Sequence, residues 1–304
     1  MPNQSSGPVQ IHTFPLPPKG FDPLKASAQD LQRYGFPRRP DAVTEAHAAS
    51  KWVKAFSQYP QFTHITPEFK DLPHRRVPNK RTQAETRGMV NATSYNWSGY
   101  VLFIGGGDRF TWVTGQWTVP KAYSPHPGDG NTYYSSHWLG IDGDGSGDVM
   151  QAGTESDSDG TCYAWFEWFP DWSHGIGNFP VNPGDVISLV LCATSSTTAW
   201  MSIGNMTSKI YTNFSFTAPA GTTLVSNCAE AIVEAPEING ALAGLARYGE
   251  CYFDDFTAYT ANGNNFDIDT GTPISMVAPD GVTVISAPTL EGSADMMSCA
   301  YTGS

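Results

Sequence analysis

Three side chains able to take part in proton transfer or to bind an oxyanion stand in stretches that are otherwise apolar. Glu167 lies inside an aromatic run, Gln151 inside a short apolar run, and Glu234 near the end of the Ala-rich stretch 228–237. An unpaired carboxylate is costly to bury, so such a residue suggests a cleft rather than a core, and nearby rings would raise its pKa. Taken singly, each residue also fits an edge strand that faces water.

Alternation along the chain predicts which of these side chains share a surface. In a strand, successive side chains point to opposite faces. Within the aromatic run 161–170, one face then holds Tyr163, Trp165, Glu167 and Phe169. By the same rule Glu230 and Glu234 project from one face of their strand, opposite Ala231 and Val233.

The segments that must position these residues have the residue pattern of an all-β protein. After Asn91, short β-branched and aromatic runs alternate with Gly, Asp, Ser and Asn turns every 8–12 residues, which indicates an antiparallel sandwich or barrel. A brief helix is expected only from Ile238 to Tyr248. The predicted strands are 97–104, 110–119, 134–142, 148–153, 161–169, 185–194, 198–204, 209–217, 228–235 and 281–287.

Charge divides the chain near residue 90. Residues 1–90 hold 13 basic and 7 acidic side chains, a net charge of +6, whereas residues 91–304 hold 4 basic and 22 acidic ones, a net charge of −18. The chain is therefore interpreted as a basic, Pro-rich leader (1–90) followed by one acidic domain (91–304). Such an acidic domain would be repelled by nucleic acid, and no apolar run is long enough to span a membrane.

The leader itself has little predicted structure. Its first 41 residues are extended and rich in proline, while apolar residues at helical spacing between Asp41 and Tyr59 predict one amphipathic helix. Two dibasic pairs, Arg75-Arg76 and Lys80-Arg81, follow in an open and polar stretch. This stretch suits a processing site or, equally, a solvated linker.

Three other patterns are compatible with chemistry but have simpler explanations. Asp269-Thr-Gly-Thr matches one loop of an aspartic peptidase, but those enzymes need two such loops and the chain has one. The Asp- and Gly-rich stretch 142–148 imitates part of a calcium loop, although Gly153 stands where a Glu ligand is required, and a hairpin turn is favoured. Five widely spaced cysteines argue against a zinc site and leave disulfides or buried thiols.

Several segments, taken in order, resemble the eqolisins, the fungal-type glutamic endopeptidases that work in acid. No one of them is decisive, but six in a single order make a chance match improbable. The matching segments are Asn96-Trp-Ser-Gly-Tyr100, Gly115-Gln-Trp-Thr-Val-Pro120, His137-Trp-Leu-Gly-Ile-Asp-Gly143, Gln151-Ala-Gly153, Tyr163-Ala-Trp-Phe-Glu-Trp-Phe-Pro170 and Ala229-Glu-Ala-Ile-Val-Glu234.

The resemblance implies a fold and a set of site residues. The fold is an antiparallel β-sandwich of two packed, curved sheets, concanavalin-like, and the activity is that of an acid endopeptidase that uses no metal or cofactor. Glu234 and Gln151 occupy the positions of the family's catalytic dyad. Residues of the family's substrate cleft carry over to Trp97, Gly99, Trp138, Asp142, Glu155 and Glu167. Glu155 and Ala231 depart from the family pattern, which places an Asp and an aromatic residue there, and this bears on specificity.

The resemblance also gives the leader and the location of the protein an interpretation. The expected partners are protein or peptide substrates and the protein's own propeptide, and the expected location is extracellular, although no secretory signal is visible. The helix near 42–59 is predicted to cover the cleft and to be released by acid, with cleavage between about Arg75 and Val90. An unrelated N-terminal extension is the alternative.

A second class of function stays open at this stage. Aromatic faces of β-sandwiches often hold sugars, so Glu167 in an aromatic groove could serve a lectin or a glycoside hydrolase. Two carboxyl groups about 5 to 10 Å apart across an open groove would favour the hydrolase.

Overall fold

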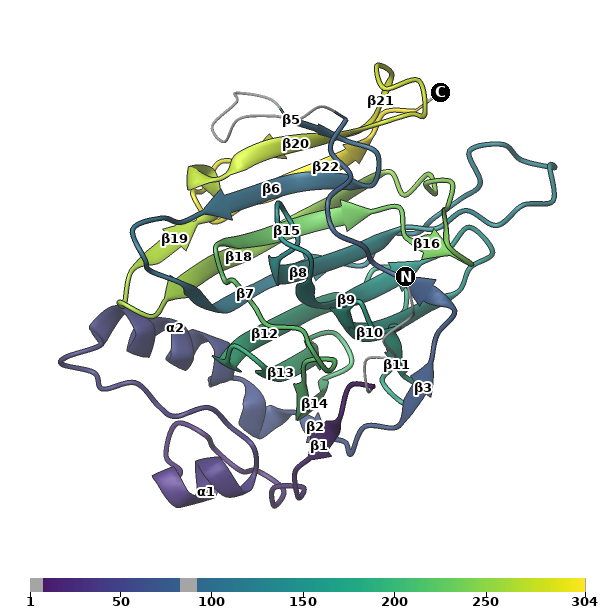
Figure 1. Cartoon of the computed structure of the whole chain (residues 1–304). Helices are drawn as coiled ribbons and strands as arrows, with labels where there is room; N and C mark the ends of the chain where they lie inside the picture. Colours follow the sequence, from purple (N-terminus) through teal and green to yellow (C-terminus); the bar gives the residue numbers. More distant parts are fainter. Residues whose placement is uncertain (1–7, 83–91, 304) are drawn as a thin grey trace.

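The computed structural model describes residues 8–82 and 92–303, and most of its elements are antiparallel strands (Figure 1). Hydrogen bonding runs continuously through one long ribbon of strands that folds back on itself into two layers. The β-sandwich prediction is therefore confirmed. Each of the ten predicted strands overlaps an observed one.

The first layer, here called the site sheet, carries the candidate residues. Its order in space is β3 (Phe69–Asp71), β11 (His174–Ile176), β10 (Cys162–Phe169), β9 (Val149–Ser156), β8 (Ser136–Asp142), β15 (Cys228–Glu234), β6 (Trp97–Phe103), β20 (Thr272–Val277) and β5 (Ala92–Ser94). Only the pairing of β5 with β20 is parallel.

The second layer, the back sheet, is joined to the first through β21 (Val284–Leu290), which pairs with β20 on one side and with the back sheet on the other. Its order is β22 (Met297–Tyr301), β18 (Glu250–Thr260), β7 (Phe110–Thr118), β12 (Val186–Ser195), β13 (Thr198–Asn205) and β14 (Ile210–Thr217), with β19 (Asn265–Asp267) beside β18. The turn η2 (Ile268–Thr270) precedes β20.

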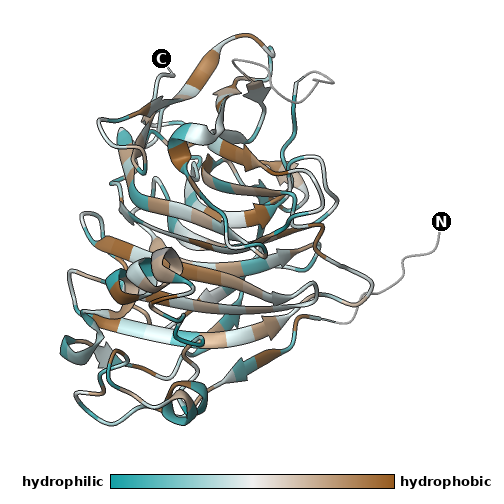
Figure 2. Ribbon diagram, turned by 90° about the vertical axis from the view of Figure 1, so that its left-hand side faces the viewer, coloured by the Kyte–Doolittle hydropathy of each residue, from teal (hydrophilic) through white to brown (hydrophobic). Residues whose placement is uncertain are grey.

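Alternation separates the core from the outer surfaces, as the pattern of hydrophobic residues along the strands illustrates (Figure 2). On β15, Ala229, Ala231 and Val233 pack into the core between the two sheets, in one hydrophobic cluster with back-sheet residues such as Leu189 and Leu191. The intervening residue Ile232 packs instead on the outer face of the site sheet. Glu230 and Glu234 therefore lie on that outer face, as predicted.

The leader adds strands and helices to both sheets. β1 (Ile11–Thr13) and β2 (Thr63–His64) pair with β14, and β3 pairs with β11. A small third sheet joins β4 (His74–Arg75) to β16 (Glu237–Ile238) and β17 (Ala241–Leu242). The remaining leader elements are α1 (Ala28–Arg33), α2 (Ala46–Phe56) and η1 (Tyr59–Gln61). The predicted boundary near residue 90 falls outside the described residues.

The predicted helix in the leader exists as α2, but its expected position over the cleft is wrong. Trp52 and Phe56 of α2 are fully buried against Val190, Trp200 and Tyr211, on the outer face of the back sheet. This face offers a large apolar surface, and the apolar stripe of α2 packs on it because burial of aromatic rings is strongly favourable.

The predicted helix from Ile238 to Tyr248 is also wrong. Asn239 and Gly240 both have positive φ, 53° and 82°, and they form a tight turn between β16 and β17. An Asn-Gly pair is the preferred two-residue hairpin turn, and it overrides a weak helical pattern. All five cysteines are free thiols, of which Cys162 alone is not fully buried. Among the described residues, no helix is long and apolar enough to cross a membrane.

Candidate active site

The register of the site sheet brings the predicted residues onto one outer face. Gln151 on β9 lies opposite Glu167 on β10, and Glu234 on β15 lies opposite Ser136 on β8. Ser136 in turn lies opposite Glu155 on β9. The strands β10, β9 and β15 therefore place three carboxyl groups and one amide on the same surface, and all four of these side chains are fully buried.

These groups are buried because part of the leader crosses them. We call residues 74–81 the inserted segment. The carbonyl oxygen of Arg76 accepts a hydrogen bond from Gln151 Nε2 at 2.7 Å, and the N–H of Val77 donates to Glu234 Oε1 at 2.9 Å. Gln151 and Glu234 thus contact the two ends of a single peptide bond, Arg76–Val77.

Further contacts hold the backbone on both sides of that bond. The N–H of Arg76 donates to Glu167 Oε2 at 2.9 Å. The carbonyl oxygen of Val77 accepts from Asn96 Nδ2 and from Trp97 Nε1, each at 3.1 Å. These contacts fix the peptide in one register, since together they use the N–H and the carbonyl oxygen of both Arg76 and Val77.

Two tryptophans shape the region around Glu234. Trp138 Nε1 donates to Glu234 Oε2 at 3.0 Å, and the rings of Trp97 and Trp138 meet edge to face with centroids 5.0 Å apart. The carboxyl group of Glu234 is therefore oriented by an N–H donor on each oxygen, one from the indole and one from the inserted segment.

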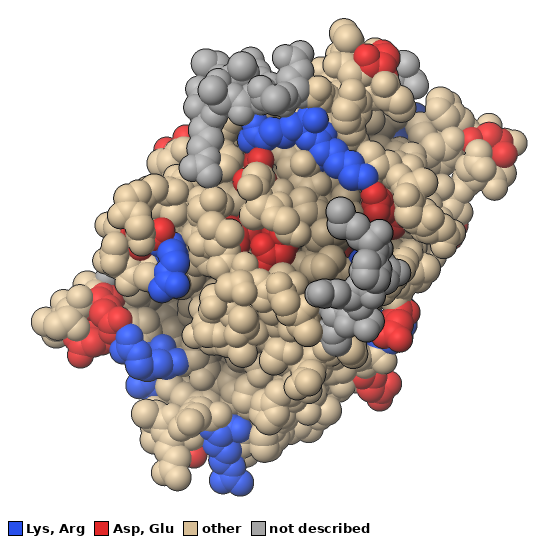
Figure 3. All heavy atoms as spheres, viewed as in Figure 1, with Lys and Arg blue, Asp and Glu red and all other residues tan. Residues whose placement is uncertain are grey.

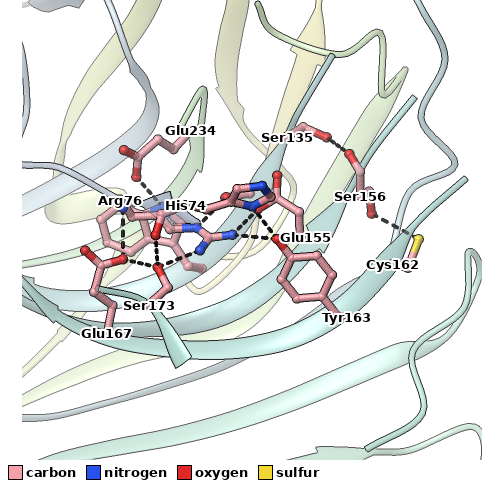
Figure 4. A network of polar contacts seen from close by, with 12 residues as sticks. His74, Arg76, Ser135, Glu155, Ser156, Cys162, Tyr163, Glu167, Ser173 and Glu234 are labelled. Atoms are coloured by element: carbon pink, nitrogen blue, oxygen red, sulfur yellow. Dashed lines mark hydrogen bonds and ion pairs between the residues drawn. The ribbon is translucent and has the colours of Figure 1, made fainter. Parts of the chain in front are cut away.

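The side chain of Arg76 enters a pocket beside these backbone contacts, and it is fully buried (Figure 4). Its Nε donates to Ser136 Oγ at 2.9 Å, and its Nη1 donates to Ser173 Oγ at 2.7 Å. Nη2 forms an ion pair with Glu155 Oε2. The guanidinium also lies over the ring of Trp165, 4.0 Å from its centroid.

Burial under the inserted segment changes the acidity of the carboxyl groups. Loss of water raises the pKa of Glu234 well above its ordinary value, and the nearby Glu167 adds to this effect. Burial likewise raises the pKa of Glu167 to about 7, although Arg76 opposes the change. Burial also opposes the ionisation of Glu155, but the facing guanidinium of Arg76, together with His74 and a hydrogen bond from Ser136, holds the pKa of Glu155 below 4.5.

Not every predicted cleft residue touches the inserted segment. Gly99 lies in β6, where the backbones of β6 and β15 approach closely. A Cβ atom at this position would stand 2.1 Å from the carbonyl oxygen of Ala231. Asp142 accepts hydrogen bonds from the N–H groups of Ser226 and Asn227 at 2.7 and 3.0 Å, so it anchors a neighbouring turn. The other predicted residues, which are Gln151, Glu234, Trp97, Trp138, Glu155 and Glu167, contact the segment or each other.

Sequence reasoning missed four residues that build the site. Asn96 could have been predicted, because it is the first residue of the first segment that resembles the eqolisins. Arg76 belongs to a dibasic pair, which suggested a processing site or a linker instead. Ser136 and Ser173 carry no signal in the sequence, since isolated serines are common in any chain. Only the folded structure shows that both serines contact the guanidinium of Arg76.

The alternative interpretations of the sequence find little support. Asp269 lies exposed in η2, a short turn on the surface. The stretch 142–148 is a hairpin turn between β8 and β9, as predicted. Among the described residues, no group of three His, Cys, Asp or Glu side chains is placed to hold a metal ion.

The fold and the site together define a β-sandwich that holds an extended peptide between a Glu and a Gln. Residues 95–301 match the family model described as the Peptidase A4 family. The chain therefore belongs to this family, the eqolisin family of glutamic peptidases, which confirms the resemblance and argues against a sugar-binding protein.

Two curated relatives match this chain. Aspergillopepsin-2 of Aspergillus niger is 29% identical over 184 residues, and scytalidopepsin B of Scytalidium lignicola is 30% identical over 166 residues. Each match covers 54% of this chain, together with 64% and 57% of the respective relative. The matches thus span less than two thirds of the length of either relative.

Solved structures of relatives agree with the fold. Scytalido-glutamic peptidase with a transition state analog inhibitor is 26% identical, with a TM-score of 0.61 over 68% of this chain and 98% of that chain. Aspergilloglutamic peptidase from Aspergillus niger is also 26% identical, with a TM-score of 0.51 over 56% of this chain and 99% of that chain.

Proposed function

We propose that the protein is an endopeptidase that acts in acid and uses Glu234 and Gln151 as its catalytic dyad. The observation that carries this proposal is the Arg76–Val77 peptide bond, whose carbonyl oxygen receives the Gln151 amide and whose N–H is directed to the Glu234 carboxyl group. A substrate bound in this way would present the two atoms at which peptide hydrolysis needs help. Membership of a glutamic peptidase family supports the same assignment.

The two side chains would divide the chemistry. Glu234, ionised, takes a proton from a water molecule, whose oxygen attacks the carbonyl carbon of the substrate. The resulting oxyanion accepts a hydrogen bond from Gln151, whose amide does not titrate in acid; one such donor contributes about 3 to 4 kcal/mol in other enzymes. Glu234 then gives its proton to the nitrogen of the departing amine, and the C–N bond breaks.

A carboxylic acid suits this role at low pH. A free glutamic acid has a pKa of about 4.3, so a large fraction is ionised near pH 4, where a histidine base would already be protonated. With the inserted segment in place, burial keeps the proton on Glu234. We infer that Glu234 becomes an effective base only when this segment leaves and water reaches the carboxyl group.

Residues 1–90 would accordingly act as an intramolecular inhibitor, and residues 91–304 as the peptidase domain. The inserted segment fills the site, and ion pairs such as Arg76–Glu155, Lys80–Glu237 and Arg81–Asp144 connect it to the acidic domain. Basic and acidic side chains lie next to one another at several places on this face (Figure 3). Acid would weaken these pairs as the carboxylates take up protons.

The remaining features of the proposal rest on the family. We propose that the protein is a secreted zymogen that acts on protein or peptide substrates. Removal of the leader would require cleavage between about Arg75 and Val90.

Replacement of the two dyad residues tests the proposal. The full chain is incubated with casein at pH 3.5, as wild type and as the variants Glu234→Gln and Gln151→Ala. We expect both variants to lose proteolysis while circular dichroism shows the wild-type fold. Full activity in either variant would reject the assignment.

Glu230→Gln is the matched control for Glu234→Gln. Glu230 is equally buried and lies on the same face of the same strand, but in the described part of the chain no hydrogen bond or ion pair joins it to the inserted segment. The control should digest casein as the wild type does. Equal loss of activity in both variants would indicate damage to the strand rather than to the chemistry.

A further inference from the structure

The pocket that holds the side chain of Arg76 is built for a cation. Four polar side chains from β8, β9, β10 and the turn after β10 surround the guanidinium, namely Ser136, Glu155, Tyr163 and Ser173. The ring of Trp165 covers one flat side of the group. A buried carboxylate is costly unless it is paired, so an occupant without positive charge would leave Glu155 uncompensated.

The shape of the pocket favours arginine over lysine. The guanidinium uses three nitrogens, since Nε and Nη1 each donate to a serine hydroxyl and Nη2 pairs with Glu155. A flat fork of N–H donors that also stacks on an indole matches arginine, whereas lysine offers one compact ammonium group. The pocket therefore distinguishes shape as well as charge.

The position of the pocket relative to the proposed dyad gives it a function. The residue whose side chain fills the pocket is the same residue whose carbonyl oxygen receives the Gln151 amide. We propose that this pocket is the primary specificity pocket of the enzyme and selects substrates with arginine immediately before the bond that is cut. This inference rests on the proposed function, and it adds the class of substrate.

The acidity of Glu155 is compatible with this use in acid. The facing guanidinium holds the pKa of Glu155 below 4.5 despite its burial. Bound arginine thus favours the ionised carboxylate, and selectivity for arginine should decline as pH falls through the lowered pKa of Glu155, as the hold on the inserted segment does.

A peptide panel tests the proposal on the full chain after incubation at pH 3.5. The peptides follow residues 74–79 with Ala in place of Arg75, and the residue before Val is Arg, Lys, Gln or Leu. Mass spectrometry identifies the bond that is cut. We expect kcat/KM to be about tenfold or more higher for Arg than for Leu, with Lys between them.

The variant Glu155→Gln sharpens the test. The ratio of kcat/KM for the Arg peptide to that for the Leu peptide should fall about tenfold in this variant. A ratio is insensitive to the fraction of correctly folded enzyme, so a merely structural role of Glu155 would not change it. Asp255→Asn, which removes a leader ion pair on the back sheet, should leave the ratio unchanged.

The outcomes separate this inference from the proposed function. Cleavage of the four peptides at similar rates by the wild type would overturn the arginine pocket and leave the peptidase intact. No cleavage of casein or of any peptide would instead overturn the proposed function. The wild-type panel decides the matter even where Glu155→Gln does not fold.

Discussion

The leader contacts the folded domain in two different ways on its two outer faces. On the back sheet, α2 docks by packing rings, with Trp52 and Phe56 buried against Trp200 and Tyr211. On the site sheet, the inserted segment docks through backbone hydrogen bonds and a buried ion pair between Arg76 and Glu155.

The difference shows how one leader can combine a contact that is stable at all pH values with a contact that responds to pH. Apolar packing depends little on pH, because the rings of Trp52, Phe56 and Trp200 carry no titrating group. Contacts with carboxyl groups depend on pH, since each protonation changes the charge at the interface. The back-sheet contact would therefore retain the leader, while the site-sheet contact would respond to acid.

Replacement of the buried Arg76 should weaken the site-sheet contact of the leader more than any other single change. Arg76→Met leaves Glu155 buried without its ion-pair partner, which costs about 3 to 5 kcal/mol in comparable cases. Hydrogen exchange at neutral pH should show loss of protection across residues 74–81 but not across α2. Arg75→Met is the matched control, because Arg75 is only half buried and packs on Phe169 and Trp172, and it should cost far less.

Two carboxyl groups make the docking of the inserted segment depend on pH in opposite directions. The pKa of Glu167 is raised to about 7, so docking gains stability as pH falls from 7 toward 4.5. The pKa of Glu155 is lowered, so its contribution is complete above 4.5 and is lost as pH falls through the lower value. Each net proton changes the free energy by about 1.4 kcal/mol per pH unit.

Hydrogen exchange measures how docking of the inserted segment depends on pH. The full chain carries Glu234→Gln for this experiment, so that it does not digest itself. Protection of residues 74–81 should change little between neutral pH and about pH 4.5, because the pKa of His74, lowered by burial to about 4, opposes the raised pKa of Glu167, and it should fall below about pH 4.5, while protection of α2 stays level. A steady rise in protection down to pH 3 would contradict acid release of the inserted segment.

A change in the apolar contact should have a smaller effect, independent of pH. Phe56→Leu removes part of a buried ring and should destabilise docking of α2 by about 1 to 2 kcal/mol. Chemical denaturation at pH 7 and at pH 4 should give the same difference from the wild type. A difference that varied strongly with pH would contradict the proposed division between the two faces.

The smallest effect is expected from the ion pair that Lys54 of α2 makes with the back sheet. Lys54 and Asp255 are partly exposed, so solvent screens their attraction. Asp255→Asn should therefore change stability by about 0 to 1 kcal/mol, and less at high salt. A larger loss in denaturation experiments would show that charge, and not ring packing, holds the helix.

Much of the fold could be predicted from local pattern. Period-two alternation places Glu167 and Trp165 on one face of β10, and this holds in the structure because the opposite face carries Phe166 and Trp168 into the core. The sequence did not predict β18, where a register shift near Asp255 interrupts the alternation.

The site was only partly predictable, because its completion depends on contacts between distant parts of the chain. Gln151 and Glu234 could be located by family resemblance, and the sheet then brought them to one peptide bond. Nothing local to Arg76 indicates that it lies beside Glu155, 79 residues away. The helix rather than the basic segment was expected over the site, since amphipathic spacing says that a helix has an apolar partner but not which one.

We propose that Glu234 makes this protein an acid peptidase once the inserted segment leaves it. The most direct measurement is the pH profile of casein cleavage by the full chain, as wild type, Glu234→Gln and Glu230→Gln. We predict that the wild type and Glu230→Gln gain activity below about pH 4.5, whereas Glu234→Gln has none at any pH. Cleavage by Glu234→Gln with the wild-type profile would contradict the account.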